Sequence, residues 1–187
     1  YIIIMRKIVE CVPNISAGRN QSIIDACANS VRKVKGVKLL DVDPGKSTNR
    51  TVYTFVGDPD SVVEAAFEFA KTAFELIDMS THKGEHPRMG AVDVCPFVPV
   101  ANVTVEECVE CAKKYGERVG SELGIPVYLY EEASSNPERK MLKQIRSGEY
   151  EGIKDKIYKH EWKTDFGPQE FIHKSGSTVT VSRFFLI

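Results

Sequence analysis

Two of the four histidines lie in one short stretch with other side chains that can do chemistry: His82, Lys83, Glu85, His86 and Arg88. The imidazole group has the ordinary pKa nearest neutrality, so this pair could transfer protons at physiological pH or hold a metal ion. The structural alternative is a solvated basic turn whose histidines only satisfy neighbouring backbone groups. Because loops on a rigid scaffold carry function disproportionately, proton transfer is our leading hypothesis.

The metal hypothesis comes from residues 82–86, which match the H-x-x-E-H pattern of inverted zinc peptidases. Gly84 weakens a helix, and Pro87 favours an extended conformation for the residue before it, so the two histidines are not expected on one helical face. Cys108 and Cys111 also have metal-ligand spacing, but they lie in an apolar helical pattern typical of buried small hydrophobic residues. We therefore expect no metal.

A second polar stretch, residues 45–48, reads Gly-Lys-Ser-Thr and resembles the end of a phosphate-binding P-loop. That pattern requires a glycine where the chain has Leu40, and the stretch leads into a predicted strand instead of a helix. A polar turn and a site for a substrate carboxylate remain as alternatives. Arg50 is the candidate for the second, because a guanidinium can bind a carboxylate through two parallel hydrogen bonds.

Composition narrows the classes of partner. The chain has 187 residues, 42% of them hydrophobic, and 25 Lys and Arg residues nearly balance 26 Asp and Glu residues. This balance does not predict a nucleic-acid partner and favours a small molecule or a protein. No apolar run approaches the roughly 18 residues of a membrane span, so we expect no membrane insertion and a cytoplasmic location. The five scattered cysteines are expected to be reduced thiols.

Hydrophobic periodicity and turn residues predict a single α+β domain. Strands are expected at 7–12, 37–43, 50–57, 92–98, 126–130 and 177–187, and helices at 20–35, 58–77 and 104–123, with a weak helical region at 136–158. Pro96 indicates an edge strand or a bulge. The first six elements have the order of a ferredoxin-like split βαβ sandwich, followed by an extra helix, strands and a C-terminal extension. Met5 resembles a natural start, which would make residues 1–4 upstream or non-native, and the apolar end at 184–187 suggests a partner surface.

Several longer stretches carry a resemblance to a known family. They are residues 10–14 (ECVPN), 40–43 (LDVD), 47–57 (STNRTVYTFVG), 82–97, 126–130 (PVYLY) and 165–168 (DFGP). Across residues 5–187 the chain resembles the N-terminal subdomain of the formiminotransferase family, which includes glutamate formimidoyltransferases and formiminotransferase-cyclodeaminases.

This resemblance implies a ferredoxin-like subdomain and transfer of the formimino group from N-formiminoglutamate to tetrahydrofolate, in histidine degradation and one-carbon metabolism. It implies that His86 is the catalytic histidine. The folate-contacting stretch of the family falls on Gly167, Pro168, Gln169, Glu170, Phe171, Ile172, His173, Lys174, Ser175 and Gly176. Tetrahydrofolate would be the acceptor substrate.

Side-chain chemistry suggests further roles in such a reaction. His86 could take a proton from the attacking folate nitrogen and return it to the leaving glutamate nitrogen. Asp43, at a strand end, could orient that imidazole, and His82 could add a supporting hydrogen bond. The candidates for the substrate carboxylates are Arg50, Arg88 and Lys83.

The resemblance also implies a second, C-terminal subdomain that lies across the folate from the first. The chain ends after the first, so we expect a second-subdomain partner or a homo-oligomer. A folate-binding or oligomerising half-module without catalysis of its own is the alternative function, and a zinc hydrolase is the third.

Overall fold

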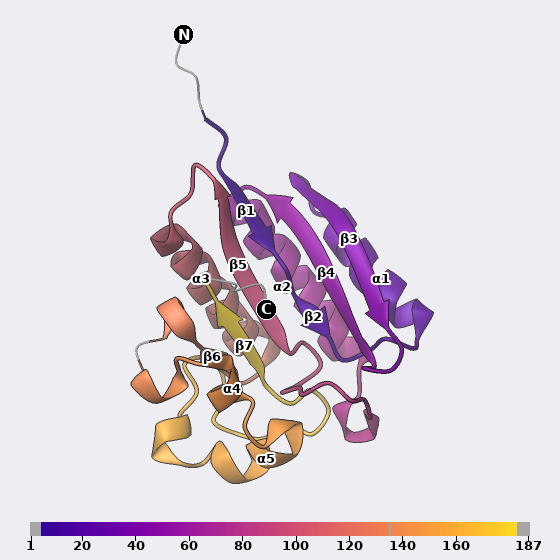
Figure 1. The fold of residues 1–187 in the computed structure, drawn as a ribbon, viewed down its shortest axis with the longest axis vertical. Helices are drawn as coiled ribbons and strands as arrows, with labels where there is room; N and C mark the ends of the chain where they lie inside the picture. Colours follow the sequence, from indigo (N-terminus) through magenta and orange to yellow (C-terminus); the bar gives the residue numbers. More distant parts are fainter. Residues whose placement is uncertain (1–4, 135, 183–187) are drawn as a thin grey trace.

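The computed structural model describes residues 5–134 and 136–182, and Figure 1 shows their arrangement. Two expectations lie outside these residues, namely those on residues 1–4 and on the apolar end at 184–187.

The chain forms one sheet with helices packed against it. The strands are β1 (Ile8–Cys11), β2 (Asn14–Ile15), β3 (Val37–Gly45), β4 (Arg50–Gly57), β5 (Val94–Ala101), β6 (Val127–Leu129) and β7 (Thr178–Val181). The α-helices are α1 (Gln21–Arg32), α2 (Pro59–Leu76), α3 (Val105–Leu123), α4 (Leu142–Ile145) and α5 (Glu149–Lys156). Short 3-10 turns occupy Met79–Thr81, Glu131–Ala133, Pro137–Arg139 and His160–Trp162.

The strand order confirms the predicted ferredoxin-like sandwich. Strand β4 pairs antiparallel with β3 and with β1 and β2, and β1 pairs antiparallel with β5. The order β3-β4-β1-β5 is that of a split βαβ unit, in which α1 and α2 make the two crossovers. The extension adds β7 and β6 beyond β5, both in parallel pairing. Strand β5 is therefore interior, so the edge position suggested by Pro96 is wrong. The carbonyl oxygen of Pro96 still accepts a hydrogen bond from the Val12 N–H at 3.3 Å.

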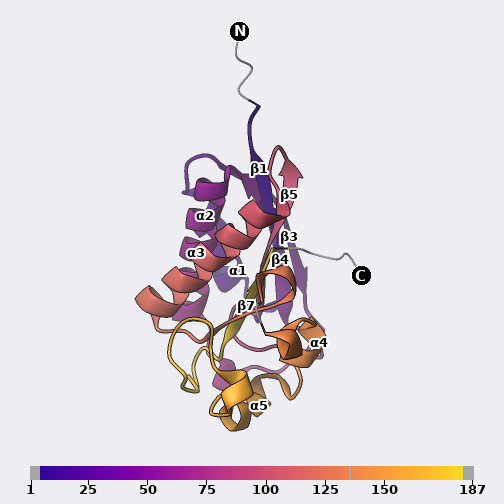
Figure 2. The ribbon, with the colours of Figure 1, turned by 90° about the vertical axis from the view of Figure 1, so that its left-hand side faces the viewer.

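Helices α1, α2 and α3 cover one face of the sheet, as Figure 2 shows in a side view. In β4 the side chains of Thr51, Tyr53 and Phe55 are buried, whereas the residues between them are partly exposed. This alternation places the core between the sheet and the helices. Tyr53 and Phe69 of α2 pack edge to face with ring centroids 4.8 Å apart. Among the described residues no helix covers the opposite face of β3, β4 and β1, which is called the open face below.

Local sequence signals set the ends of the helices. Asp58 caps α2 and Pro59 is its first residue, while Thr104 and Glu107 form the predicted capping box of α3. Gly124 ends α3 with φ of 67°. The weak helical region at 136–158 consists of a 3-10 turn and the short helices α4 and α5, which lie across the lower end of the sheet in Figure 1.

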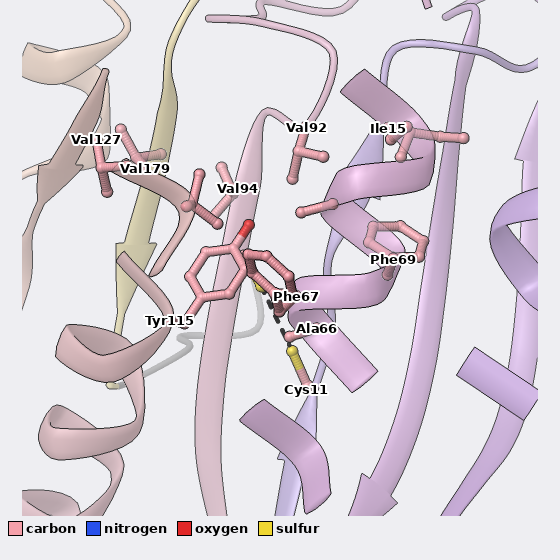
Figure 3. Close-up of a cluster of buried hydrophobic side chains, with 14 of the residues drawn as sticks. Cys11, Ile15, Ala66, Phe67, Phe69, Val92, Val94, Tyr115, Val127 and Val179 are labelled. Carbon is pink, nitrogen blue, oxygen red and sulfur yellow. Dashed lines mark hydrogen bonds between the residues drawn. The ribbon is translucent and has the colours of Figure 1, made fainter. Parts of the chain in front are cut away.

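The five cysteines belong to the core, as their apolar surroundings predict. All are buried and free. Figure 3 shows Cys11 beside Ala66 and Phe67 of α2, and its Sγ lies 3.6 Å from Sγ of Cys95. Burial raises the pKa of the Cys108 thiol to about 12 and that of Cys111 to about 11. In the described part of the chain, no helix is long and apolar enough to cross a membrane.

Candidate active site

Residues 77–93 connect α2 to β5 and are called the histidine loop below. Asn49, in the turn between β3 and β4, fixes this loop: its Nδ2 donates to the Lys83 carbonyl at 3.0 Å, and its Oδ1 accepts the Gly18 N–H at 2.9 Å. Asn49 has φ of 48°, a left-handed conformation that asparagine tolerates better than most residues. Gly84 packs so closely on this turn that a Cβ there would overlap the carbonyl oxygen of Thr48. The histidines are thus held against the end of the sheet.

His82 uses both ring nitrogens in hydrogen bonds within the protein. Arg88 Nε donates to His82 Nδ1 at 3.2 Å, so Nδ1 is the acceptor, and Nε2 carries the proton that it donates to the Asn49 carbonyl at 3.0 Å. Burial lowers the pKa of His82, and the nearby charges of Arg88 and Arg19 lower it further. His82 is therefore a neutral side chain whose two hydrogen bonds connect the histidine loop to Asn49 and Arg88.

Arg88 is already paired. Its side chain is 9% exposed, and its guanidinium donates to Glu149 at 2.8 Å and to Glu151 at 2.7 and 2.9 Å, besides its bond to His82. These carboxylates raise the pKa of Arg88 against the effect of burial. The structure therefore places Arg88 in a link between the histidine loop and α5.

His86 has the opposite character. Its side chain is partly exposed, yet its Nδ1 is buried and has no hydrogen-bond partner. Burial lowers the pKa of His86, and the positive charges of Arg50 and Arg146 lower it further, while Asp93 acts in the other direction. The lowered pKa favours the neutral imidazole near pH 7, and no group within residues 5–134 and 136–182 forms a hydrogen bond with its Nδ1.

Sequence reasoning missed Asp93 and Arg146. Asp93 is fully buried and accepts hydrogen bonds from the Met89 N–H at 2.8 Å, from Asn14 Nδ2 at 3.3 Å and from Arg146 Nη2. A lone acid within the apolar run 91–98 was a signal for Asp93. Arg146 directly follows α4 in a charged segment that gave no signal, yet its Nη2 donates to Asp93.

The other predicted residues lie on the open face or at the rim. Arg50 lies at the start of β4, and its pKa is lowered chiefly by burial. Asp43 is exposed, and because it pairs with Val52, which in turn pairs with Asn14, it lies on the same face as Asn14. No hydrogen bond among the described residues joins Asp43 to His86, so its orienting role stays a prediction. Lys83 is exposed at the rim.

Two adjoining depressions border this group. The first is a narrow hollow with a free volume of about 0 Å³, which is lined by His82, His86, Arg88 and Arg50 with Asn14, Ser16, Thr48 and Asn49. A wider cleft of about 680 Å³ shares His82 and Arg88 with it and extends past Lys83, Tyr150 and Glu151. A substrate in the cleft would be next to the hollow.

The stretch at 167–176 has two ends with different neighbours. Gly167, with φ of 76°, packs against Gly120 and Ile125 at the end of α3. At the other end, Ser175 accepts the Ala91 N–H at 2.8 Å, so residues 174–176 run beside the histidine loop. Between them, the Phe171 ring lies 5.3 Å from the ring of Tyr150, which lines the wider cleft. Only the second half of the stretch adjoins the histidines.

The same geometry bears on the metal hypothesis. Both ring nitrogens of His82 are occupied by Arg88 and Asn49, so the two histidines are not arranged as the ligand pair of the H-x-x-E-H motif. Within residues 5–134 and 136–182 there is no group of three His, Cys, Asp or Glu side chains that could hold a metal ion.

Comparisons with known proteins point to one family. Residues 8–183 match the family model described as "Formiminotransferase domain, N-terminal subdomain". The chain is 62% identical to the formimidoyltransferase-cyclodeaminase of Dictyostelium discoideum and 58% identical to that of Mus musculus, in each case over 98% of the chain and 34% of the relative. It is 47% identical to the glutamate formimidoyltransferase of Streptococcus pyogenes serotype M1, over 98% of the chain and 61% of the relative. The chain thus spans about a third to three fifths of the length of these relatives.

Proposed function

Because the chain belongs to the formiminotransferase family, as an N-terminal subdomain, we propose that it takes part in transferring the formimino group from N-formiminoglutamate to tetrahydrofolate. In this proposal His86 is the acid and base that moves the proton. The observation that carries it is the buried, unpartnered Nδ1 of a neutral imidazole at the edge of a hollow. Relatives named for formimidoyl transfer match this chain over nearly its whole length.

The proton transfer follows from the state of the side chain. The folate N5 attacks the formimino carbon and forms a tetrahedral intermediate, in which N5 carries an extra proton and the glutamate nitrogen needs one. His86 accepts the proton from N5 and donates it to the glutamate nitrogen, after which the bond between that nitrogen and the formimino carbon breaks. A base must be unprotonated at the start, and the lowered pKa of His86 meets this condition.

We further propose that tetrahydrofolate contacts the stretch at 167–176. The support is that residues 174–176 adjoin the histidine loop and that Phe171 packs on Tyr150 at the wall of the wider cleft. An aromatic wall suits a flat pterin ring. A folate placed there would reach the hollow from the side of the cleft.

The open face of the sheet is our candidate surface for a second subdomain. Val52 and Val56 of β4 are partly exposed there. The hollow beside His86 lies at one end of this face, so a domain packed on it would close the site. Such closure would exclude water and position both substrates, which accounts for much of the rate in group transfer.

The test combines binding with turnover on the whole chain. Tetrahydrofolate binding is measured by titration calorimetry, and 5-formiminotetrahydrofolate formation by absorbance, for the wild type, His86→Ala and His160→Ala. His160 is an exposed histidine in a 3-10 turn far along the chain, so it serves as the matched control. We expect His86→Ala to lower the transfer rate by about 10²- to 10⁴-fold with folate binding retained.

Other outcomes separate the alternatives. Folate binding without transfer, in the wild type, would favour the half-module that binds folate or oligomerises. Addition of a purified C-terminal subdomain from a relative should then restore transfer. Transfer that persists in His86→Ala would refute the role of His86, and the absence of both folate binding and transfer, with the added subdomain as well, would refute the proposal.

A further inference from the structure

Arg50 is a half-buried cation without a partner. Within residues 5–134 and 136–182 its guanidinium makes no hydrogen bond or ion pair, and its Nε is closed off from solvent. Leaving a charged donor unsatisfied in this way is costly, and a bound anion is one of the groups that can satisfy it. The nearby acid, Asp93, is already used: its oxygens accept from a backbone N–H, from Asn14 and from Arg146.

Arg146 contributes a second excess donor to the same place. One nitrogen, Nη2, binds Asp93, while its Nε is buried and has no partner. Arg146 and Asn14 bind the same carboxylate oxygen of Asp93, and Asn14 lines the hollow beside His86. The group therefore holds two guanidinium charges around the imidazole, with Asp93 bound to Arg146 and with Asp43 close enough to raise the pKa of Arg50.

A buried arginine elsewhere in the chain shows the balanced arrangement. Arg139 donates to both oxygens of Asp165, at 2.8 and 3.2 Å, so one cation faces one anion. Its Nε is also unpartnered. Among the described residues Arg50 has no carboxylate in hydrogen-bond contact, and this distinguishes the site at His86 from the ion pair of Arg139.

We propose that Arg50 and Arg146 together bind the α-carboxylate of the acidic amino-acid substrate, beside His86. This inference rests on the proposed function. In N-formiminoglutamate the nitrogen that must be protonated is attached to the carbon that bears the α-carboxylate. A clamp beside His86 thus reaches this carboxylate first, and the side-chain carboxylate extends away from the imidazole. Guanidinium groups suit the task because their donors match the two oxygens of a carboxylate.

The neighbouring cations are less suited to this role. Arg88 already donates to two carboxylates and to His82, so a substrate would have to displace those bonds. Lys83 is exposed at the rim, where water screens its charge. It could attract the side-chain carboxylate without fixing its position.

The experiment uses three ligands that separate the two carboxylates. L-Glutamate has both, L-glutamine keeps the α-carboxylate, and γ-aminobutyrate keeps only the one that corresponds to the side chain. Binding to the whole chain is measured by NMR titration, with and without tetrahydrofolate. We expect Arg50→Met and Arg146→Met each to weaken binding of L-glutamate and L-glutamine by about tenfold to a hundredfold and to leave γ-aminobutyrate binding unchanged.

Controls address folding. Arg146→Met leaves Asp93 buried without its cation, so the double variant Arg146→Met with Asp93→Asn is measured beside it. Arg50→Met breaks no bond within the described residues and should fold as the wild type does. Arg139→Met is the matched control, which should lower the unfolding temperature without changing L-glutamate affinity.

Several results would overturn the clamp: unchanged L-glutamate affinity in Arg50→Met, a loss confined to γ-aminobutyrate, an equal loss in Arg139→Met, or no L-glutamate binding to the wild type in either condition. Binding that depends on Arg50 and Arg146 in a chain that shows no formimino transfer with an added second subdomain would sustain the clamp and refute the proposed function. Formimino transfer with a KM for N-formiminoglutamate that neither Arg50→Met nor Arg146→Met changes would sustain the proposed function and refute the clamp.

Discussion

Replacing Gly84 with alanine should displace the histidine loop. The new Cβ would overlap the Thr48 carbonyl oxygen and lie 2.9 Å from the carbonyl carbon of Thr48 and 3.0 Å from Asn49 Cβ. Two carbon atoms in contact prefer a separation of about 3.5 to 4.0 Å. Thr48 and Asn49 both belong to the turn between β3 and β4, whose backbone has little freedom to move away. The loop must therefore move by a distance of the order of 1 Å.

Two hydrogen bonds join the loop to this turn, from Asn49 Nδ2 to the Lys83 carbonyl and from His82 Nε2 to the Asn49 carbonyl. Each contributes about 1 kcal/mol, and the loss is partly offset by about 0.5 to 1 kcal/mol because alanine restricts the unfolded chain. We expect a net destabilisation of about 1 to 2 kcal/mol and an unfolding temperature lower by about 3 to 6 °C. A displacement of 1 Å should also reduce the proposed formimino transfer by about 10²-fold, far more than this loss of stability explains.

Calorimetric unfolding and the transfer assay, run with an added second subdomain if the chain needs one, measure the two effects. The matched control is Gly152→Ala in α5, where a Cβ would lie 3.9 Å from the nearest atom, the Ser147 carbonyl oxygen. That change should leave transfer intact and stabilise the helix by up to about 1 kcal/mol. Wild-type stability and transfer in Gly84→Ala, or an equal loss in Gly152→Ala, would show that the loop is not held as described.

Three further predictions concern charge. Because burial lowers the pKa of His86, we expect the transfer rate to be steady near pH 7 and to fall with pH only below about 6.5; an acid limb above pH 7 would contradict this. Burial also lowers the pKa of Lys156 to about 8, so the unfolded chain binds more protons than the folded chain between pH 8 and 10.5. Denaturant titrations should therefore show the stability of the wild type rising relative to that of Lys156→Met across this window, by on the order of 3 kcal/mol. A stability difference that does not change with pH would refute this prediction. Arg88→Met should lower the free energy of unfolding by about 1 to 2 kcal/mol and raise the pKa of His82 in an NMR titration. Arg118→Met, which breaks the more exposed ion pairs of an arginine on α3, should lower it by less than about 1 kcal/mol. Equal losses of stability would argue against the link between Arg88 and α5.

Much of the fold was predictable because its determinants are local. The alternation in β4 and the helical periodicity of α2 and α3 give the element type, and the caps at Asp58 and Thr104 give the starts of the helices. Pro96 shows the limit of such reasoning. Proline lacks a donor, which suggests an edge, but the pairing of a strand depends on segments that follow much later, here β7.

The site was predictable only in part, for a related reason. The histidine loop is contiguous, so its composition singles it out. Asp93 and Arg146 are 53 residues apart, so their pairing depends on the tertiary structure. An arginine in a charged segment resembles a solvated one until the tertiary structure supplies the buried acid.

The different roles proposed for His82 and His86 also follow from tertiary contacts. Burial is the largest cause lowering the pKa of both His82 and His86, so their pKa values do not tell them apart. Their hydrogen bonds do. For His82 to accept a proton at Nδ1, it would have to lose its bond from Arg88 and place a positive charge against that guanidinium. Among the residues that the structure describes, none forms a hydrogen bond with His86 Nδ1, so it has no bond to lose. Connectivity, more than acidity, therefore favours His86 as the group that moves the proton in the proposed transfer, and it explains why two histidines in one loop need not share one role.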